Sequence, residues 1–397
     1  MENESRTCKT SRGAALWELL TLFLRMGFTA FGGPAAHIAM FEEEVVRRKR
    51  WLTHEQFLDL LGITNIIPGP NSTEMVIHIG YMRAGIIGMI VAGTAFILPA
   101  SVIVGVCAWV YVHFGQIPQT EGILLGVKPI VIAIILQALW VLGKKALKTK
   151  AQFVLAALCV LLLLLGLGEL SLLLIAGTIA AFSSAYHKGI QRHRSGLVIL
   201  VSIVVLFTFA QLSLPLLING DAYPFTLPSL FLFFFKVGSI LYGSGYVLIA
   251  FIESSLVTRF QWITELQLLD AVAIGQVTPG PLFTTATFIG YLLAGTAGAA
   301  VATLGIFLPS FFFVGISGPL IPKIRKSVIA SAFLDGVIVA SLALMTVVSL
   351  QLGFSILTNI TSLLIFHFCL LLLLRYKVNA TWLIVAGAAG GLVYSLF

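Results

Sequence analysis

Residues 68–74 read Pro68-Gly69-Pro70-Asn71-Ser72-Thr73-Glu74, and the first three recur 211 residues later as Pro279-Gly280-Pro281. Proline lacks a backbone donor and clashes with the preceding helical turn, so two prolines flanking a glycine end one helix and start another. Both stretches lie in strongly apolar surroundings. The sequence therefore predicts two broken helices at equivalent places in the chain.

The surrounding residues repeat as well. Matched pairs at the same offset, and at an offset of 210 after Pro281, are Gly27/Gly238, Trp51/Trp262, Gln56/Gln267, Asp59/Asp270, Tyr81/Tyr291 and Pro99/Pro309. A shared register of this kind indicates an internal duplication. We expect a first transporter repeat over residues 14–185, a linker with one odd transmembrane helix over 186–224, and a second, inverted repeat over 225–397.

The composition places the chain in a lipid bilayer. Of its 397 residues 59% are hydrophobic and only 10% are charged, whereas soluble domains carry about 25% charged residues. The net charge of +8 indicates membrane sidedness rather than nucleic-acid binding. We expect an all-α polytopic membrane protein with apolar runs at 84–114, 118–142, 151–167, 169–185, 196–219, 294–317, 328–350, 353–374 and 378–396.

Each repeat opens with two interrupted segments, which we interpret as re-entrant helical hairpins. The first segment is broken at Gly32-Gly33-Pro34, and its counterpart at Gly243-Ser244-Gly245; the second is broken at the Pro-Gly-Pro runs. Thr53 and Gln56, like their counterparts Thr264 and Gln267, have capping-box spacing and mark where each second hairpin begins.

The basic residues predict the orientation of the two repeats. With re-entrant hairpins and one odd helix between the repeats, 20 of the 24 Lys and Arg fall on one side, all except Arg25, Lys128, Lys236 and Arg259. Positive residues gather in cytoplasmic loops, which places the N-terminus in the cytoplasm. Inverted repeats around broken helices are typical of secondary transporters, with the substrate near the bilayer midplane.

The breaks supply the first candidate site. Asn71, Ser72 and Thr73 follow Pro70 and start a half-helix whose free N–H groups suit an anion. In the second repeat Leu282 and Phe283 stand in their place, which predicts unequal half-sites. The alternative is that each Pro-Gly-Pro is only a tight turn between packed helices.

Two matched cations lie within apolar stretches. Arg25 and Lys236 are equivalent at the offset of 211, and a buried cation in a membrane is costly enough to suggest a role in an anion pathway. Arg25 could instead snorkel or pair with Glu18. Lys128 has no charged counterpart, because Ile338 stands at the matched position.

The acidic and imidazole side chains are candidates for a proton relay. The matched Asp59 and Asp270 could carry protons or pair with Arg25, Lys236 or a backbone N–H, while Glu74 and His37 occur near the breaks of the first repeat only. A structural role for each remains the alternative. We find no pattern for a metal cage, a catalytic triad or a phosphate-binding loop, and so expect no cofactor and no enzymatic activity.

The motifs together resemble the chromate ion transporter family in its long two-domain form. The resemblance rests on Phe31-Gly32-Gly33-Pro34-Ala35-Ala36-His37-Ile38, on Arg48-Lys49-Arg50-Trp51-Leu52 and on Pro68 to Glu74, and it continues in the second repeat from Phe235 to Tyr246 and from Thr278 to Pro281. It implies efflux of chromate across the bacterial plasma membrane, driven by membrane potential or proton antiport. Sulfate or another tetrahedral oxyanion would fit the same donors.

The expected partners are therefore a chromate-like or sulfate-like oxyanion, protons and the lipid bilayer, with a homodimer as one compatible assembly. Two rival functions remain: a transporter or channel for another small ion, such as a cation or sulfate taken up into the cell, and a membrane scaffold without transport. Two repeats that point the same way, or Arg25 and Lys236 far apart and facing acyl chains, would contradict the transporter hypothesis, and a closed, dry midplane would favour the scaffold.

Overall fold

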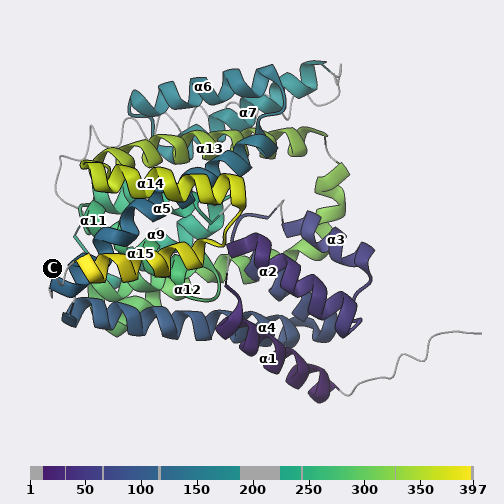
Figure 1. Cartoon of the computed structure of the whole chain (residues 1–397). Coiled ribbons are helices and arrows are strands. Elements are labelled where there is room, and N and C mark those ends of the chain that lie inside the picture. Colours follow the sequence, from purple (N-terminus) through teal and green to yellow (C-terminus); the bar gives the residue numbers. More distant parts are fainter. Residues whose placement is uncertain are drawn as a thin grey trace, which may run out of the picture.

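The computed structural model describes residues 12–31, 33–64, 67–114, 118–187, 224–242, 245–326 and 328–394. The predicted odd helix at 196–219 lies outside these residues, as do Gly32, Gly243 and Ser244. Every regular element within the described ranges is a helix (Figure 1). The prediction of an all-helical chain is therefore confirmed for this part of the molecule.

The helices occur in two matching series. The first comprises α1 (Arg12–Thr29), α2 (Gly33–Phe41), the π-helix η1 (Glu42–Arg48), α3 (His54–Thr64), α4 (Asn71–Phe114), α5 (Pro118–Ala146), α6 (Lys150–Leu164) and α7 (Glu169–His187). The second comprises α9 (Leu227–Ile240), α10 (Val247–Ile252), the π-helix η3 (Glu253–Arg259), α11 (Glu265–Val277), the 3-10 turn η4 (Leu282–Thr284), α12 (Thr285–Lys326), α13 (Val328–Ile356), α14 (Ile360–Leu371), the π-helix η5 (Leu372–Tyr376) and α15 (Ala380–Tyr394).

The expected helix breaks are present. The chain leaves α1 before α2 and leaves α3 before α4, and the second series is interrupted at the matched places. Thr53 and Gln56 bond reciprocally through their side chains and backbone N–H groups, and Thr264 and Gln267 do the same, so both capping boxes are confirmed. The local sequence signals thus determine where the second hairpin of each repeat begins.

Both long helices bend at matched residues. In α4 the backbone leaves helical geometry at Ala84 and Gly85, and in α12 at Ala294 and Gly295, with nearly identical dihedral angles. Gly85 and Gly295 have φ of +64° and +57°, a region that glycine enters without a steric penalty. The sequence predicts a short half-helix followed by a spanning helix. In each series the structure instead joins the two into one helix with a bend.

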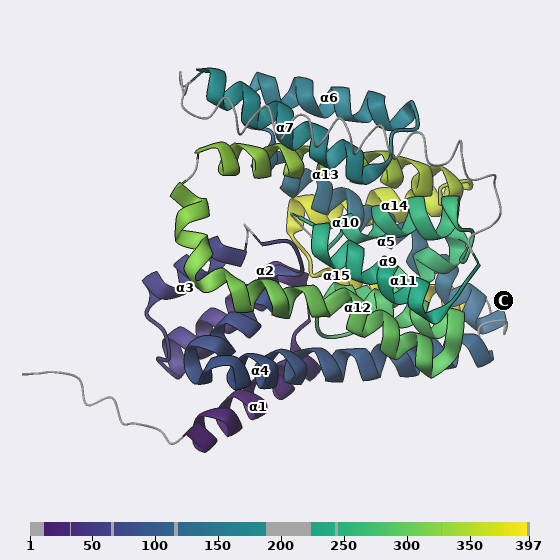
Figure 2. The same cartoon turned by 180° about the vertical axis from the view of Figure 1, so that it is seen from behind.

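The two series interleave rather than pack as separate units. Helix α1 packs along α4 and α9 along α12, but α7 of the first series packs along α13, and α15 of the second along α5. Helices α4 and α12 also contact each other along their length. Helices α3 and α11 lie toward opposite ends of the helical body in both views (Figures 1 and 2).

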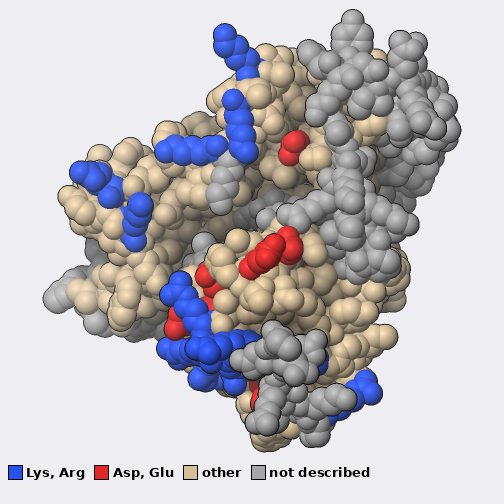
Figure 3. Space-filling model, turned by 90° about the vertical axis from the view of Figure 1, so that its right-hand side faces the viewer, with Lys and Arg blue, Asp and Glu red and all other residues tan. Residues whose placement is uncertain are grey.

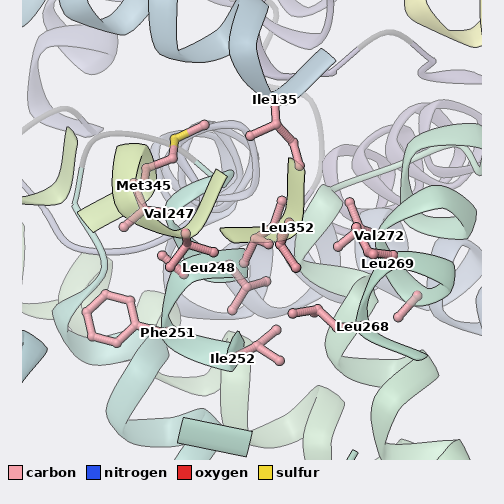
Figure 4. Close-up of a cluster of buried hydrophobic side chains, with 14 of the residues drawn as sticks. Ile135, Val247, Leu248, Phe251, Ile252, Leu268, Leu269, Val272, Met345 and Leu352 are labelled. Carbon is pink, nitrogen blue, oxygen red and sulfur yellow. The ribbon is translucent and has the colours of Figure 1, made fainter. Parts of the chain in front are cut away.

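An apolar core forms where the two series meet. Ile135 from α5 of the first series and Phe251 from α10, Leu268 from α11 and Leu352 from α13 of the second are fully or almost fully buried in one cluster (Figure 4). A second, smaller cluster lies among α1, α2, α3 and α4 around Phe23, Phe41 and Phe96. This packing holds the helix breaks in fixed positions.

Within the part of the chain that the structure describes, four helical segments are long and apolar enough to cross a membrane: Asn71–Phe114, Leu125–Lys144, Leu282–Ile316 and Ile329–Ile356. Large apolar side chains such as Phe354 and Trp382 are more than two-thirds exposed, as expected for surfaces that face acyl chains. Helix α6 has 15 residues and rises about 22 Å, which is shorter than the hydrocarbon core of a bilayer.

Basic side chains are numerous on the end of the molecule that carries α3. The end that carries α3 faces the viewer in Figure 3 and bears many Lys and Arg side chains. Arg47 and Arg48 end η1, and Lys144, Lys148 and Lys150 lie around the short connection from α5 to α6. This distribution matches the clustering of positive charge that the sequence predicts.

Candidate transport site

The two Pro-Gly-Pro turns are joined to the helix breaks of the opposite series. The backbone N–H of Gly69 donates to the carbonyl of Leu241 at 2.8 Å, and the N–H of Gly280 donates to the carbonyl of Ala30 at 2.8 Å. Ala30 and Leu241 are themselves matched at the offset of 211, at the ends of α1 and α9. The four breaks therefore meet in two pairs, with one break from each series in each pair, and we call the region of these two pairs the crossing.

Glycine is required at the centre of each turn. Gly69 has φ of +136° and Gly280 has φ of +93°, and both are buried. A Cβ on Gly69 would lie 2.5 Å from Oε1 of Glu74 and 2.7 Å from Oγ of Ser310, while a Cβ on Gly280 would overlap the Cβ of Ala100. Each turn thus packs against the long helix of the other series.

The turn in the first series is surrounded by buried polar groups. Thr73 and Glu74 begin α4, His78 follows one helical turn later, and Ser310 approaches from α12. Tyr242, just after α9, is close enough to Glu74 to interact with its charge. These side chains give the crossing a polar centre within an otherwise apolar bundle.

The turn in the second series differs. Leu282–Thr284 form a 3-10 turn before α12, and the hydroxyls of Thr284 and Thr285 donate to the carbonyls of Pro281 and Leu282. The matched turns therefore have unlike chemistry, as the loss of Asn71 and Ser72 equivalents in the second repeat predicts. Pro68, Pro70, Pro279 and Pro281 are all buried.

His37 is connected to the same crossing. Its Nε2 lies 3.0 Å from the carbonyl of Ala30, which also accepts the N–H of Gly280. The ring is 1% exposed and packs edge-to-face on Phe96. His37 lies on α2, which starts at Gly33 and Pro34. In the second series Gly245 precedes the equivalent helix α10 and lies near the ring of Phe283.

Arg25 lies away from the crossing. Its guanidinium is paired with Glu44 at 2.7 Å, and Arg48 bonds the same carboxylate at 3.1 Å. These groups line a hollow of 470 Å³ between α1, α2 and η1. The partner proposed from sequence was wrong, because Glu18 instead pairs with Arg83 at 2.7 Å.

Lys236 occupies the matched position on α9 and is exposed. It interacts electrostatically with Glu169 and Arg259, and Ser255 stands where the first series has Glu44. Within the described residues, the two cations each lie beside the π-helix of their own series rather than together at the crossing.

The matched aspartates have different surroundings. Asp270 is 2% exposed; its carboxylate is paired with Lys128 at 3.1 Å and accepts a hydrogen bond from the Tyr111 hydroxyl at 2.8 Å. Asp59 is exposed. The partners considered for Asp270 from sequence were therefore wrong, and the unmatched Lys128 provides its counter-ion.

Sequence reasoning missed Ser310, Tyr111 and Tyr242. Only Lys128 gave a signal, because a cation in an apolar run needs a buried counter-charge. Within the described residues, no three His, Cys, Asp or Glu side chains gather as the ligands of a metal ion would.

Apolar helices of spanning length, broken helices that meet inside the bundle and a polar centre at their crossing define a multi-pass membrane transport protein. The chromate transporter family model matches residues 17–182 and again residues 228–392. The chain belongs to the chromate transporter family.

Individual relatives agree with this assignment. The chain is 31% identical to the chromate transport protein of Cupriavidus metallidurans over 94% of its own length and 92% of the relative, and 30% identical to that of Pseudomonas aeruginosa over 95% and 92%. A probable chromate transport protein of Synechococcus elongatus is 30% identical over 82% of both chains. No solved structure matches the chain.

Proposed function

We infer that this protein is a secondary transporter that exports chromate, or a related tetrahedral oxyanion such as sulfate, across the bacterial plasma membrane. Its N-terminus lies in the cytoplasm, and its two repeats, 14–185 and 225–397, have opposite orientations. The observation that carries the proposal is the pair of hydrogen bonds that ties the Pro-Gly-Pro turn of each series to the helix break of the other.

Several observations support the opposite orientations. Helices α3 and α11 are matched in sequence yet lie toward opposite ends of the molecule, and basic side chains are numerous on the end with α3. A crossing of broken helices between inverted halves supplies a midplane site that either half can expose by moving against the other.

The membrane potential favours export. Each elementary charge that crosses 100 mV is worth about 2.3 kcal/mol, so a dianion that leaves an inside-negative cell gains about 4.6 kcal/mol. Proton antiport is the second possible driving force, with Asp59, Asp270, Glu74 and His37 as relay candidates. Arg25 and Lys236 serve as entry cations on the two sides in this proposal, and the crossing holds the ion in transit.

Purified protein in chromate-loaded liposomes tests the function. We expect chromate efflux that rises when a potassium gradient with valinomycin makes the lumen negative and falls when it makes the lumen positive. Protein-free liposomes are the control. Movement of Na⁺ without chromate would favour the cation-transport alternative, and the absence of any ion flux from correctly folded protein would favour a scaffold.

A further inference from the structure

The turn of the first series is surrounded by a cluster of buried side-chain oxygens that have no hydrogen-bond partner. Among the described residues, both carboxyl oxygens of Glu74, Oγ1 of Thr73 and Oγ of Ser310 are buried and make no hydrogen bond. None of the three residues has any exposed surface. Buried polar groups almost always have a partner, so a set of unpartnered ones indicates a ligand or a proton-transfer role.

These atoms converge from two helices. Oε1 of Glu74 on α4 and Oγ of Ser310 on α12 lie 2.5 and 2.7 Å from the point that a Cβ of Gly69 would occupy, so both face the same side of the turn. Thr73 is in the first turn of α4, where backbone N–H groups have no acceptor within the helix. Side chains from two helices thus face one side of the turn, and the first turn of α4 follows it directly in the chain.

The second turn shows that the fold does not need these groups. At the position that matches Ser310 the chain has Ala100, whose methyl group packs against Gly280. At the position that matches Glu74 it has Thr284, whose hydroxyl donates to the Pro281 carbonyl. Phe288 replaces His78. The fold therefore builds the same turn in the second series without an unpartnered oxygen at the matched residues Ala100 and Thr284.

The chemistry of the cluster identifies its ligand. An ionised carboxylate without a partner is very unfavourable in a protein interior, and it would repel an anion. A neutral carboxylic acid instead donates one hydrogen bond, as do the hydroxyls of Thr73 and Ser310. Together with the start of α4, each of these three side chains can direct one donor toward an incoming oxyanion.

We propose that Glu74, Thr73 and Ser310, around the Gly69 turn, form a single site per chain that binds a tetrahedral oxyanion together with a proton, and that Glu74 holds the proton. The proposal rests on the proposed function and selects the membrane potential, rather than proton antiport, as its driving force. A dianion then crosses with one proton and a net charge of −1, so the membrane potential drives export and the proton accompanies the anion.

Binding of sulfate, which stays a dianion at neutral and alkaline pH, tests the proposal on purified full-length protein. Calorimetry in buffers of different ionisation enthalpy measures the protons taken up. In the pH range where Glu74 of the free protein is ionised, we expect the wild type to take up about one proton per sulfate. In that range the sulfate affinity should fall about tenfold for each unit by which the pH rises. Glu74→Gln keeps the neutral shape, so its affinity should be independent of pH and its proton uptake zero.

Ser310→Ala provides a second variant, since alanine already occupies the matched position 100. We expect at least a tenfold weaker sulfate affinity, with proton uptake retained. The matched control is Ser349→Ala, a buried serine on α13 whose hydroxyl donates to the Met345 carbonyl, and it should bind like the wild type.

Unchanged proton uptake in Glu74→Gln would overturn the proposal, and so would wild-type sulfate affinity that stays independent of pH up to the most alkaline pH at which the protein remains folded. Loss of chromate flux from wild-type liposomes would instead contradict the proposed function. The two failures are therefore separable, because one concerns the protons bound with the anion and the other concerns whether the anion moves.

Discussion

At the scale of single residues, position 280 requires glycine for two reasons: its backbone has a positive φ, and a Cβ there would overlap Ala100. A positive φ costs about 1–2 kcal/mol for a residue with a Cβ, and overpacking adds about 1–3 kcal/mol. Because a Cβ on Gly280 would overlap that of Ala100, Gly280→Ala should lower the free energy of unfolding by both amounts. Thermal unfolding of the protein in detergent measures the change.

A second substitution separates these two contributions. Adding Ala100→Gly to Gly280→Ala removes the overlap but not the strain, so we expect partial recovery of the melting temperature. Gly105→Ala, where a Cβ meets no atom within 4 Å, is the control and should leave stability nearly unchanged. If Gly280→Ala melts like Gly105→Ala, the described packing of the turn is wrong.

Arg25 can be tested apart from its ion pair. If the guanidinium attracts the oxyanion, Arg25→Gln should slow chromate flux in liposomes more than Glu44→Gln, although both substitutions break the same salt bridge. Equal effects, together with a double variant no worse than either single one, would restrict Arg25 to a structural role. Arg25→Lys, which keeps the charge, should retain most of the flux.

At the scale of helices, the pair of Lys128 and Asp270 links α5 to α11 across the two series. Removing one member of a buried pair leaves an uncompensated charge, which typically costs about 3–5 kcal/mol. Asp270→Asn should therefore destabilise the protein strongly, while Lys128→Met with Asp270→Leu should recover much of the loss. The exposed Asp59, matched in sequence, serves as control: Asp59→Asn should change the free energy of unfolding by no more than about 1 kcal/mol, because interactions of exposed charged groups contribute about 0–1 kcal/mol.

Equal melting temperatures for Asp270→Asn and Asp59→Asn would contradict the ion pair.

The contrast between these aspartates also shows what an internal repeat cannot predict. The repeat predicts that Asp59 and Asp270 occupy equivalent backbone positions, but their neighbours come from helices in which Lys128 is matched by Ile338.

The helix breaks and caps were predictable because they depend on local chemistry. Proline, glycine and capping side chains act within a few residues, so the ends of α3, α4 and α11 could be located from sequence. The hydrogen bonds of Gly69 to Leu241 and of Gly280 to Ala30 join residues far apart in the chain, and the proximity of Ser310 to Glu74 depends on how α12 packs on α4. Neither contact leaves a pattern along one sequence.

At the scale of the whole molecule, the account depends on two matched series of helices that enter the bilayer from opposite sides and meet at their breaks. The exposed residues Glu55 on α3 and Leu266 on α11 are equivalent at the offset of 211 and mark the two hairpins. Their sidedness in the membrane tests the arrangement without reference to any substrate.

The most direct measurement is labelling of single cysteines in intact cells with a membrane-impermeant maleimide, after the four native cysteines have been replaced. We predict that Leu266→Cys reacts from outside and that Glu55→Cys reacts only after the cells are permeabilised. Reaction of both cysteines from the same side would contradict the opposite orientation of the two repeats.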